Sequence, residues 1–332
     1  MEKKTVSVVM CTYNGERFLR EQMDSILAQT YPIHEIIISD DCSTDGTIDI
    51  LREYAAKHTF IKIHQNARNI GFNSNFYHAF NRATGEYIAI SDQDDIWSTQ
   101  KVEKLIEKIT LDKKYNLCFS HSTFSDSQQI NQIPSPLNAE ALLFNNCIPG
   151  HAMLLKKEFI TNLPLWKNIG FYYDWWLIMN AALENSVVEC KESLVWHRIY
   201  NEAASVSITQ KIKKQKKSSL LLPYIIGFYH FLQLRKTYDW FFFYQNIYKK
   251  TSTTNHPALH KISKYLIGKH ITDIFWLCLA CMKYRHKIYP SIHKQNKIMF
   301  LVRSFCTPFI CSYYNLQFYN TCLQENKHHS NQ

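Results

Sequence analysis

Glycine and proline are scarce in this chain, with 8 and 9 among 332 residues. This scarcity excludes collagen-like and low-complexity architectures. No run of about 18 uninterrupted apolar residues occurs, so we expect no membrane-spanning helix. The first four residues, with two lysines and then only a short apolar run, do not resemble a secretory signal. We therefore expect a reducing compartment, in which the ten cysteines stay free and act as small buried hydrophobic residues.

Two common nucleotide-binding fingerprints are also missing. No Gly-x-Gly-x-x-Gly follows the first predicted strand, which argues against a Rossmann dinucleotide site. No glycine-rich loop ending in Lys-Ser or Lys-Thr occurs, which argues against a P-loop protein and against a nucleotidyltransferase with a phosphate loop.

Charge is distributed unevenly along the chain. Residues 1–205 carry 19 Lys and Arg against 25 Asp and Glu, a net charge of −6. Residues 206–332 carry 19 against 3, a net charge of +16, together with 23 of the 47 aromatic residues. The composition changes at a lysine-rich run over 211–217. We therefore predict a boundary near residue 206, with one domain over 1–205 and a basic, aromatic-rich region over 206–332.

Short apolar runs alternate with helical periodicity in the first part of the chain. Continuous apolar runs are typical of buried parallel strands, and apolar residues three or four apart are typical of amphipathic helices. This alternation predicts an α/β fold, a mostly parallel sheet with helices on both faces. The expected strands are 6–10, 36–38, 61–64 and 87–90, and the expected helices lie within 19–27, 48–55 and 72–83.

Polar clusters follow three of these strands directly. In such sheets the ligand lies beyond the carboxyl ends of the strands. A single Asp-Asp pair after a strand is usually a helix cap or a solvated turn, but three clusters at successive strand ends favour a binding site. Aromatic, hydroxyl and amide groups could hold a base and ribose, and paired carboxylates could hold Mg or Mn on a diphosphate. The clusters are Cys11-Thr12-Tyr13-Asn14-Gly15, Ser39-Asp40-Asp41-Cys42-Ser43 and Ser91-Asp92-Gln93-Asp94-Asp95.

These clusters, in this order and spacing, resemble glycosyltransferase family 2 over about residues 5–205. The resemblance also rests on Asn69-Ile70-Gly71 and on Ala83-Thr84-Gly85-Glu86-Tyr87-Ile88. It implies a GT-A fold and transfer of a sugar from a nucleotide-sugar donor with inversion at the anomeric carbon. Within the family, Asp92-Gln93-Asp94-Asp95-Ile96-Trp97 resembles the bacterial surface-polysaccharide branch, which includes rhamnosyltransferases.

The resemblance implies roles for the donor half, residues 1–115. Asp41, rather than Asp40, matches the acidic residue that binds the base. Asp92 and Asp94 match the D-x-D pair at the ribose and the metal, and Asp95 shares the metal role. The implied donor-binding residues are Thr12, Tyr13, Asn14, Asp41, Arg68, Asn69 and Asp92, and the implied ligands of the divalent cation, Mg or Mn, are Asp94 and Asp95.

The acceptor half, residues 116–205, contains the implied catalytic base. Asp174 matches the family's base, and an inverting displacement needs a group that removes the proton of the acceptor hydroxyl. It is also explained as a helix N-cap, and both roles are compatible. The flanking Trp175 and Trp176 are expected to stack on a sugar ring and exclude water.

Four further positions are implied on the acceptor side, Gly150, His151, Arg198 and Tyr200. Gly150 and His151 match the strand that closes the active site, although a lone histidine such as His151 is more often structural. Relatives place an Arg, and two residues later a metal-binding His, after the last strand. Here Arg198 is followed by Tyr200, while His197 precedes it. Because a neutral Tyr is a poor ligand for Mg or Mn, the sequence leaves open which residue takes the place of that His.

The basic region contains no recognisable catalytic motif. Its apolar stretches over 220–234, 275–282 and 300–309 are expected to form amphipathic helices with basic and aromatic rims, which are typical of an interface with anionic lipid. The aromatic run 240–244 is expected to lie at headgroup depth. An ordinary helical subdomain is the alternative. Nucleic acid is not expected, because no recognition motif is present. The Cys278-x-x-Cys281 spacing has no second pair and is not expected to bind zinc.

These features predict an inverting glycosyltransferase that uses a nucleotide-sugar donor and a divalent cation. By resemblance, its acceptor is a growing surface glycan on a lipid carrier. We expect a cytoplasmic protein that is peripherally associated with the inner face of a bacterial cytoplasmic membrane. The alternative is a catalytically inactive nucleotide-sugar binding or scaffold protein, and the intact aspartates argue against it.

Overall fold

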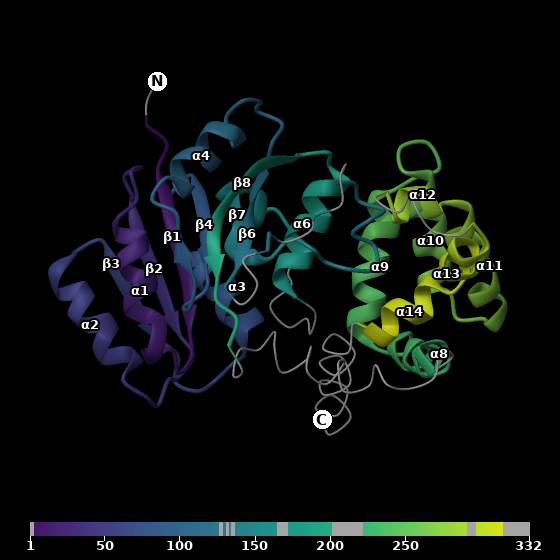
Figure 1. Cartoon of the computed structure of the whole chain (residues 1–332), viewed down its shortest axis with the longest axis horizontal. Helices are drawn as coiled ribbons and strands as arrows, with labels where there is room; N and C mark the ends of the chain where they lie inside the picture. Colours follow the sequence, from purple (N-terminus) through teal and green to yellow (C-terminus); the bar gives the residue numbers. More distant parts are fainter. Residues whose placement is uncertain are drawn as a thin grey trace. The chain divides into compact units, whose positions relative to one another are not determined.

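A computed structural model describes residues 3–125, 129–130, 133, 137–164, 172–200, 222–290 and 297–314. The chain forms two compact units, which are described separately (Figure 1). The sheet unit comprises Met1–Gln132, Ile148–Ile169 and Glu184–Ile199. The helical unit comprises Ile133–Cys147, Gly170–Leu183 and Tyr200–Gln332.

Within the described residues, the sheet unit contains one eight-stranded sheet of order β3-β2-β1-β4-β7-β6-β8-β5. β1, β2, β3 and β4 pair in parallel, β7 runs antiparallel to β4 and β6, and β8 pairs in parallel with β6 and antiparallel with β5. The strands are β1 Val6–Thr12, β2 Glu35–Asp40, β3 Ile61–Gln65, β4 Tyr87–Ser91, β5 Ile96–Trp97, β6 Leu117–Phe124, β7 Met153–Lys156 and β8 Val187–His197.

Helices cover both faces of this sheet. Alternate residues of β1, such as Val8 and Met10, share one buried cluster with Leu19 of α1 and Leu105 of α4. Helix α3 packs on β1 and β2 and contributes nothing to that cluster, so it covers the opposite face. The helical elements are α1 Glu16–Leu27, α2 Thr47–Lys57, α3 Phe72–Arg82, α4 Lys101–Ile109, α5 Lys157–Thr161 and the 3-10 turn η1 Gly150–Ala152. The predicted α/β class and its strands are confirmed.

The helical unit consists of packed helices. Helix α9 packs on α6 and α10, α10 packs on α11, and α8 packs on α14. The helices are α6 Tyr173–Leu183, α8 Leu222–Leu234, α9 Tyr238–Lys250, α10 Pro257–Ile267, α11 Ile271–Lys283, α12 Arg285–Ile288, α13 Lys297–Phe305 and α14 Thr307–Tyr314. No helix among those described has the length and hydropathy needed to cross a bilayer.

Two segments that precede residue 200 belong to the helical unit. Helix α6 is apolar on all sides, and a helix of that kind must be surrounded by other elements. The Trp175 indole donates to the Leu142 carbonyl at 2.7 Å, and the Tyr244 hydroxyl donates to the Leu143 carbonyl at 3.0 Å. The division of the chain is therefore not sequential. The boundary expected near 206 and the lysine-rich run over 211–217 lie outside the described residues.

The expectation that residues 240–244 lie at headgroup depth is wrong for three of these five residues. Trp240, Phe243 and Tyr244 are buried within the helical unit, because the helical period turns three of five consecutive aromatics toward α6 and α10. The Trp240 indole donates to the Leu266 carbonyl at 3.1 Å. Phe243 contacts Trp175 with the ring centroids 5.2 Å apart. These side chains form core, as the alternative of an ordinary helical subdomain requires.

Candidate active site

The carboxyl ends of β1 and β2 are joined by the side chain of Asp40. Asp40 is fully buried, and its carboxylate accepts hydrogen bonds from the Thr12 hydroxyl at 2.9 Å and from the Ser43 backbone N–H at 2.9 Å. Because these strands are parallel neighbours, their predicted polar clusters meet at one edge of the sheet. Thr12 is itself buried, and its hydroxyl bond to Asp40 connects the loop after β1 to the loop after β2.

Asp41 organises the loop after β3. Its carboxylate accepts from the backbone N–H groups of Ile70 and Gly71, at 2.8 and 2.9 Å, and from the side-chain amide of Asn66 at 2.9 Å. Gly71 has φ 82°, a conformation that favours glycine. Arg68 and Asn69 lie exposed on this loop. Asp41 therefore fixes the segment that carries Arg68 and Asn69, two of the predicted donor-binding residues.

Tyr13 presents its ring to solvent while its backbone is held in place. The side chain is 48% exposed. The Gln93 side-chain amide accepts from the Tyr13 N–H at 2.9 Å and donates to the Tyr13 carbonyl at 3.1 Å. Asn14 takes a positive φ of 48°, and its side-chain oxygen accepts from the Thr44 N–H at 2.8 Å. These contacts create an exposed aromatic face on a fixed loop.

A cluster of carboxylates and imidazoles lies beyond β4. His151 Nδ1 lies 3.0 Å from Asp92 Oδ2 and 3.0 Å from Asp95 Oδ2. His197 Nδ1 lies 2.8 Å from Asp95 Oδ1, and the two imidazole rings stack with centroids 4.7 Å apart. Asp95 is fully buried, whereas the Asp92 side chain is 38% exposed. We call Asp92, Asp95, His151 and His197 the aspartate–histidine cluster; it has one solvent-exposed side.

The ionisation of this cluster is set by its own members. Burial would lower the pKa of His197, but its bond to Asp95 and the negative charges of Asp95, Asp92 and Asp94 outweigh burial and raise it. Burial would raise the pKa of Asp95, but the charges of His151 and His197 and the bonds to His197 and Arg198 lower it. Asp95 is therefore held as a carboxylate at neutral pH.

Two polar side chains fix His151 from behind. Its Nε2 lies 3.0 Å from the Ser122 hydroxyl on β6. The Lys101 ammonium, fully buried at the start of α4, donates to the His151 carbonyl at 2.6 Å and lies 3.2 Å from the Trp97 ring centroid. Burial lowers the pKa of Lys101 well below its usual range, and the charges of Asp95 and Asp92 offset this in part. His151 is thus positioned through both its ring and its backbone.

Arg198 braces the segment that carries the aspartates. Its backbone N–H donates to Asp95 Oδ1 at 3.1 Å, and its Nε donates to the Asp94 carbonyl at 3.0 Å. Its Nη2 donates to Glu21 on α1 at 2.8 Å. Tyr200, two residues further on, is half-buried. Of the two residues that the sequence left open for the family's histidine, His197 lies in the aspartate–histidine cluster.

Three members of the cluster could hold a cation. One ligand atom each from Asp95, His151 and His197 lie within 4.8 Å of one another. Asp95 Oδ2 is buried and lies 3.0 Å from His151 Nδ1 without a well-aligned hydrogen bond among the described residues, so a cation bound between the two atoms would satisfy both. Carboxylate and imidazole ligands suit Mn, and imidazole suits Mg less well. The residues present therefore fit a divalent cation, and of the two predicted ligands, Asp94 and Asp95, only Asp95 belongs to this set.

The remaining predicted residues lie in two places. Gly150 begins η1 in the sheet unit, immediately before His151. Asp174 lies in the first turn of α6 in the helical unit, where it is half-buried and its carboxylate accepts from the Trp175 N–H at 2.7 Å. Trp175 and Trp176 are buried. The expected stacking platform is therefore wrong, because both indole rings pack against Phe243 inside the helical unit.

Sequence reasoning missed several residues of the site. Gln93 was read only as part of a cluster, and Lys101 and Ser122 were not considered. Their contacts join residues 80, 50 and 29 positions apart, and no local pattern predicts such pairs. His197 is one of the two residues that the sequence left open, and it ends β8 two positions after the buried Val195.

The matching family model is "Glycosyl transferase family 2", over residues 7–185, more than half of the chain. Putative glycosyltransferase EpsE of Bacillus subtilis is 41% identical over 113 residues, 34% of this chain and 41% of EpsE. dTDP-rhamnosyl transferase RfbG of Shigella flexneri is 28% identical over 62% of this chain and 77% of RfbG. An uncharacterized protein of Mycobacterium tuberculosis is 27% identical over 59% of this chain. The chain spans 62% of the length of that relative.

Two solved structures are similar to this chain in fold. Staphylococcus aureus TarS 1–349 in complex with UDP-GlcNAc gives a TM-score of 0.57 at 14% identity, covering 94% of this chain and 90% of TarS 1–349. Mannosyltransferase PcManGT from Pyrobaculum calidifontis gives a TM-score of 0.56 at 15% identity, covering 98% of this chain and 88% of the PcManGT chain. These likenesses establish the fold and agree with the GT-A architecture that the motifs predicted. The family model, which matches more than half of the chain, shows that the chain belongs to glycosyl transferase family 2.

Proposed function

We propose that this protein transfers a sugar from a nucleotide-sugar donor to a glycan acceptor. The observation that carries the proposal is the aspartate–histidine cluster at the carboxyl edge of the sheet, where the Gln93 side chain also holds the backbone of the exposed Tyr13. TarS and PcManGT, which share the fold, have been solved with UDP-GlcNAc and with GDP-Man and Mn2+. RfbG is named a dTDP-rhamnosyl transferase.

The donor-site residues divide by what their side chains contact. Tyr13 and Arg68 are exposed, so they supply an aromatic face for the base and a positive charge for the diphosphate. Asp92 is partly exposed and is available to the ribose. Thr12, Asn14 and Asp41 bond to neighbouring loops and position these contacts, while Asn69 lies beside Arg68.

A divalent cation, Mg or Mn, fits the same cluster. Asp95, His151 and His197 would hold it, with Asp94 adding negative charge nearby. When bound, such a cation neutralises negative charge on a diphosphate leaving group. The chain's own part is to keep Asp95 ionised in a buried position and to hold His151 through Ser122 and Lys101.

Asp174 is the proposed general base of an inverting reaction. A single displacement requires a group that accepts the proton of the acceptor hydroxyl as it attacks. Asp174 is a half-buried carboxylate, and its bond from the Trp175 N–H fixes its orientation at the start of α6. Inversion at the anomeric carbon follows if the transfer has one step.

The acceptor and the place of action are proposed from composition and relatives. EpsE is named a putative glycosyltransferase, and other curated relatives include a putative teichuronic acid biosynthesis glycosyltransferase. From these relatives we propose a lipid-linked surface glycan as the acceptor. Because residues 206–332 carry a net charge of +16, we also propose peripheral association with the inner face of the cytoplasmic membrane.

A titration calorimetry experiment tests donor binding. Full-length protein is titrated with UDP, GDP and dTDP in the presence of Mn2+ and again with EDTA. We expect one nucleotide to bind, more tightly with Mn2+, and the affinity to fall in Asp92→Ala. If no nucleoside diphosphate binds under either condition, the proposal is refuted. Binding without any donor turnover would favour the alternative of an inactive nucleotide-sugar binding protein.

A further inference from the structure

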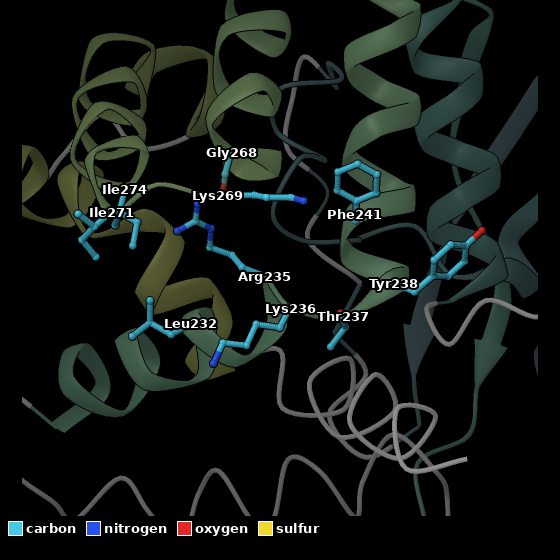
Figure 2. Close-up of a pocket in the computed structure, with 10 residues that line it drawn as sticks. All are labelled: Leu232, Arg235, Lys236, Thr237, Tyr238, Phe241, Gly268, Lys269, Ile271 and Ile274. Atoms are coloured by element: carbon cyan, nitrogen blue, oxygen red, sulfur yellow. Dashed lines mark hydrogen bonds between the residues drawn. The ribbon is translucent and has the colours of Figure 1, made fainter. Parts of the chain in front are cut away.

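A cavity of about 830 Å³ lies in the helical unit, between the end of α8, the start of α9 and the link from α10 to α11 (Figure 2). Three cationic side chains, Arg235, Lys236 and Lys269, line it. No acidic residue is among the residues that line it. The cavity is therefore a positively charged pocket that the proposed transfer reaction does not use.

Arg235 is incompletely satisfied at the centre of this pocket. Its guanidinium donates to the Gly268 carbonyl and lies 5.6 Å from the Phe231 ring centroid. Its Nε is buried and has no hydrogen-bond partner among the described residues. Burial lowers the pKa of Arg235, and the charge of Asp273 offsets this only in part. A partly buried guanidinium with Lys236 and Lys269 beside it favours an anionic oxygen in the pocket, because charge-assisted bonds strengthen away from water.

The wall of the pocket continues into exposed apolar helix faces. Leu232 lines the pocket and lies on one face of α8 with the exposed Ile225, Phe228 and Tyr229, at helical spacing. Ile271 also lines the pocket and begins α11.

The exposed face of α11 is strongly apolar. Ile271, Phe275 and Trp276 are 70%, 55% and 50% exposed. Figure 2 shows Leu232 and Ile271 on the side of the pocket where Arg235 and Lys236 place their charged ends. An exposed apolar surface therefore adjoins the cationic side chains. A ligand with hydrocarbon chains would use this surface, whereas a free phosphate or a nucleotide would not need it.

We propose that this pocket binds the phosphate head group of an anionic membrane phospholipid, with its hydrocarbon chains along the exposed faces of α8 and α11. The inference adds a defined lipid site to the peripheral association proposed above. Arg235 and its two lysine neighbours bind the phosphate oxygens. Trp276 lies at the boundary between head groups and hydrocarbon, where indole rings are enriched.

Vesicle binding by full-length protein tests the site. Vesicles of phosphatidylcholine with and without phosphatidylglycerol are titrated, and Trp276 emission is followed. We expect binding and a blue shift only with phosphatidylglycerol, and at least about tenfold weaker binding in Arg235→Gln/Lys236→Gln/Lys269→Gln, since each basic residue near an anionic surface contributes about 1 kcal/mol.

The matched control removes the same charge elsewhere in the helical unit. Lys249→Gln/Lys261→Gln/Lys264→Gln changes three exposed lysines of α9 and α10, and we expect less than about threefold weakening. Equal weakening in both triple variants would mean that only net charge matters, and would overturn the site. Trp276→Phe should keep the binding and lose the blue shift; a retained shift would overturn the placement of α11.

Soluble ligands distinguish the possible occupants. Dioctanoyl phosphatidylglycerol, used below its micellar concentration, should bind wild type and not the pocket variant. Inorganic phosphate and farnesyl phosphate should bind at least about tenfold more weakly. Phosphate binding equal to the phospholipid, or preference for farnesyl phosphate, would overturn the phospholipid assignment. Because these assays need no sugar transfer, their failure leaves the nucleotide titration unaffected, and the reverse also holds.

Discussion

Replacement of Asp95 by Asn tests the cation site at its most buried ligand. The two side chains have nearly the same shape, but the amide carries no charge and offers one oxygen. Asp95 Oδ1 accepts from His197 and from the Arg198 N–H, and the Asn oxygen can keep both bonds. The oxygen that faces His151 is lost. We therefore expect a folded variant with a damaged site.

The magnitude follows from the loss of one of three ligands. Even partners in the outer shell of a metal site change affinity by about 10–100-fold, so Asp95→Asn should weaken Mn2+ binding at least that much. Without cation, weaker charge-assisted bonds to His197 and Arg198 should cost about 1–3 kcal/mol of stability. In wild type, Mn2+ at 100 times its Kd should add about 2.7 kcal/mol, or several degrees in Tm.

Titration calorimetry with Mn2+ and thermal unfolding with and without Mn2+ measure both effects. Asp49→Asn makes the same chemical change on α2, where the Asp49 side chain is 81% exposed. It should retain the wild-type affinity and thermal shift. If Asp95→Asn is folded and binds Mn2+ as tightly as wild type, Asp95 is not a ligand and the assignment of the cluster fails.

Three further perturbations address stability, positioning and catalysis. Glu35 is buried, which favours its neutral form, but bonds from Lys62, Ser7 and Thr84 prevail and lower its pKa from 4.5 to about 2. The ionised Glu35 carboxylate therefore contributes at most about 3 kcal/mol to the free energy of unfolding above pH 4.5, and this contribution is lost as the pH falls toward 2. In urea unfolding, Glu35→Gln should be less stable than wild type at pH 6, and the difference should be much smaller at pH 2.5. A stability difference that does not change with pH would contradict this. Lys101→Met removes the donor to the His151 carbonyl and should weaken Mn2+ binding about tenfold with little loss of stability; unchanged affinity would show that Lys101 does not position His151. Asp174→Asn should lower turnover by about 10²–10⁴-fold while the donor Kd stays unchanged, and turnover like that of wild type would assign the base elsewhere.

The sheet and its binding edge were predictable because they depend on local patterns. Runs such as 6–10 and 36–38 are apolar throughout, as buried parallel strands must be, and parallel pairing brings their following loops together. The three polar clusters, which contain Thr12, Asp40 and Asp92, therefore lie at one edge of the sheet, as expected.

Contacts between distant segments were not predictable in this way. The pairing of His151 with Asp92 and Asp95 depends on η1 and β7, which enter the sheet more than 50 residues later. Composition also could not decide which aromatic residues face solvent. Trp175, Trp176 and Trp240 are buried, while Trp276 is exposed, although all four lie in similarly apolar runs. Trp175, Trp176 and Trp240 are buried because α6 packs against α9.

The most direct test of the proposed function is donor cleavage by the full-length protein. UDP-, GDP- and dTDP-sugars are incubated with Mn2+, and the release of nucleoside diphosphate is followed for wild type, Asp95→Asn and Asp49→Asn. The proposed function predicts that wild type and Asp49→Asn release nucleoside diphosphate from donors of one nucleotide class, that EDTA abolishes the release, and that Asp95→Asn loses it. Release that Asp95→Asn retains in full, or no release from any donor by wild type, would contradict it.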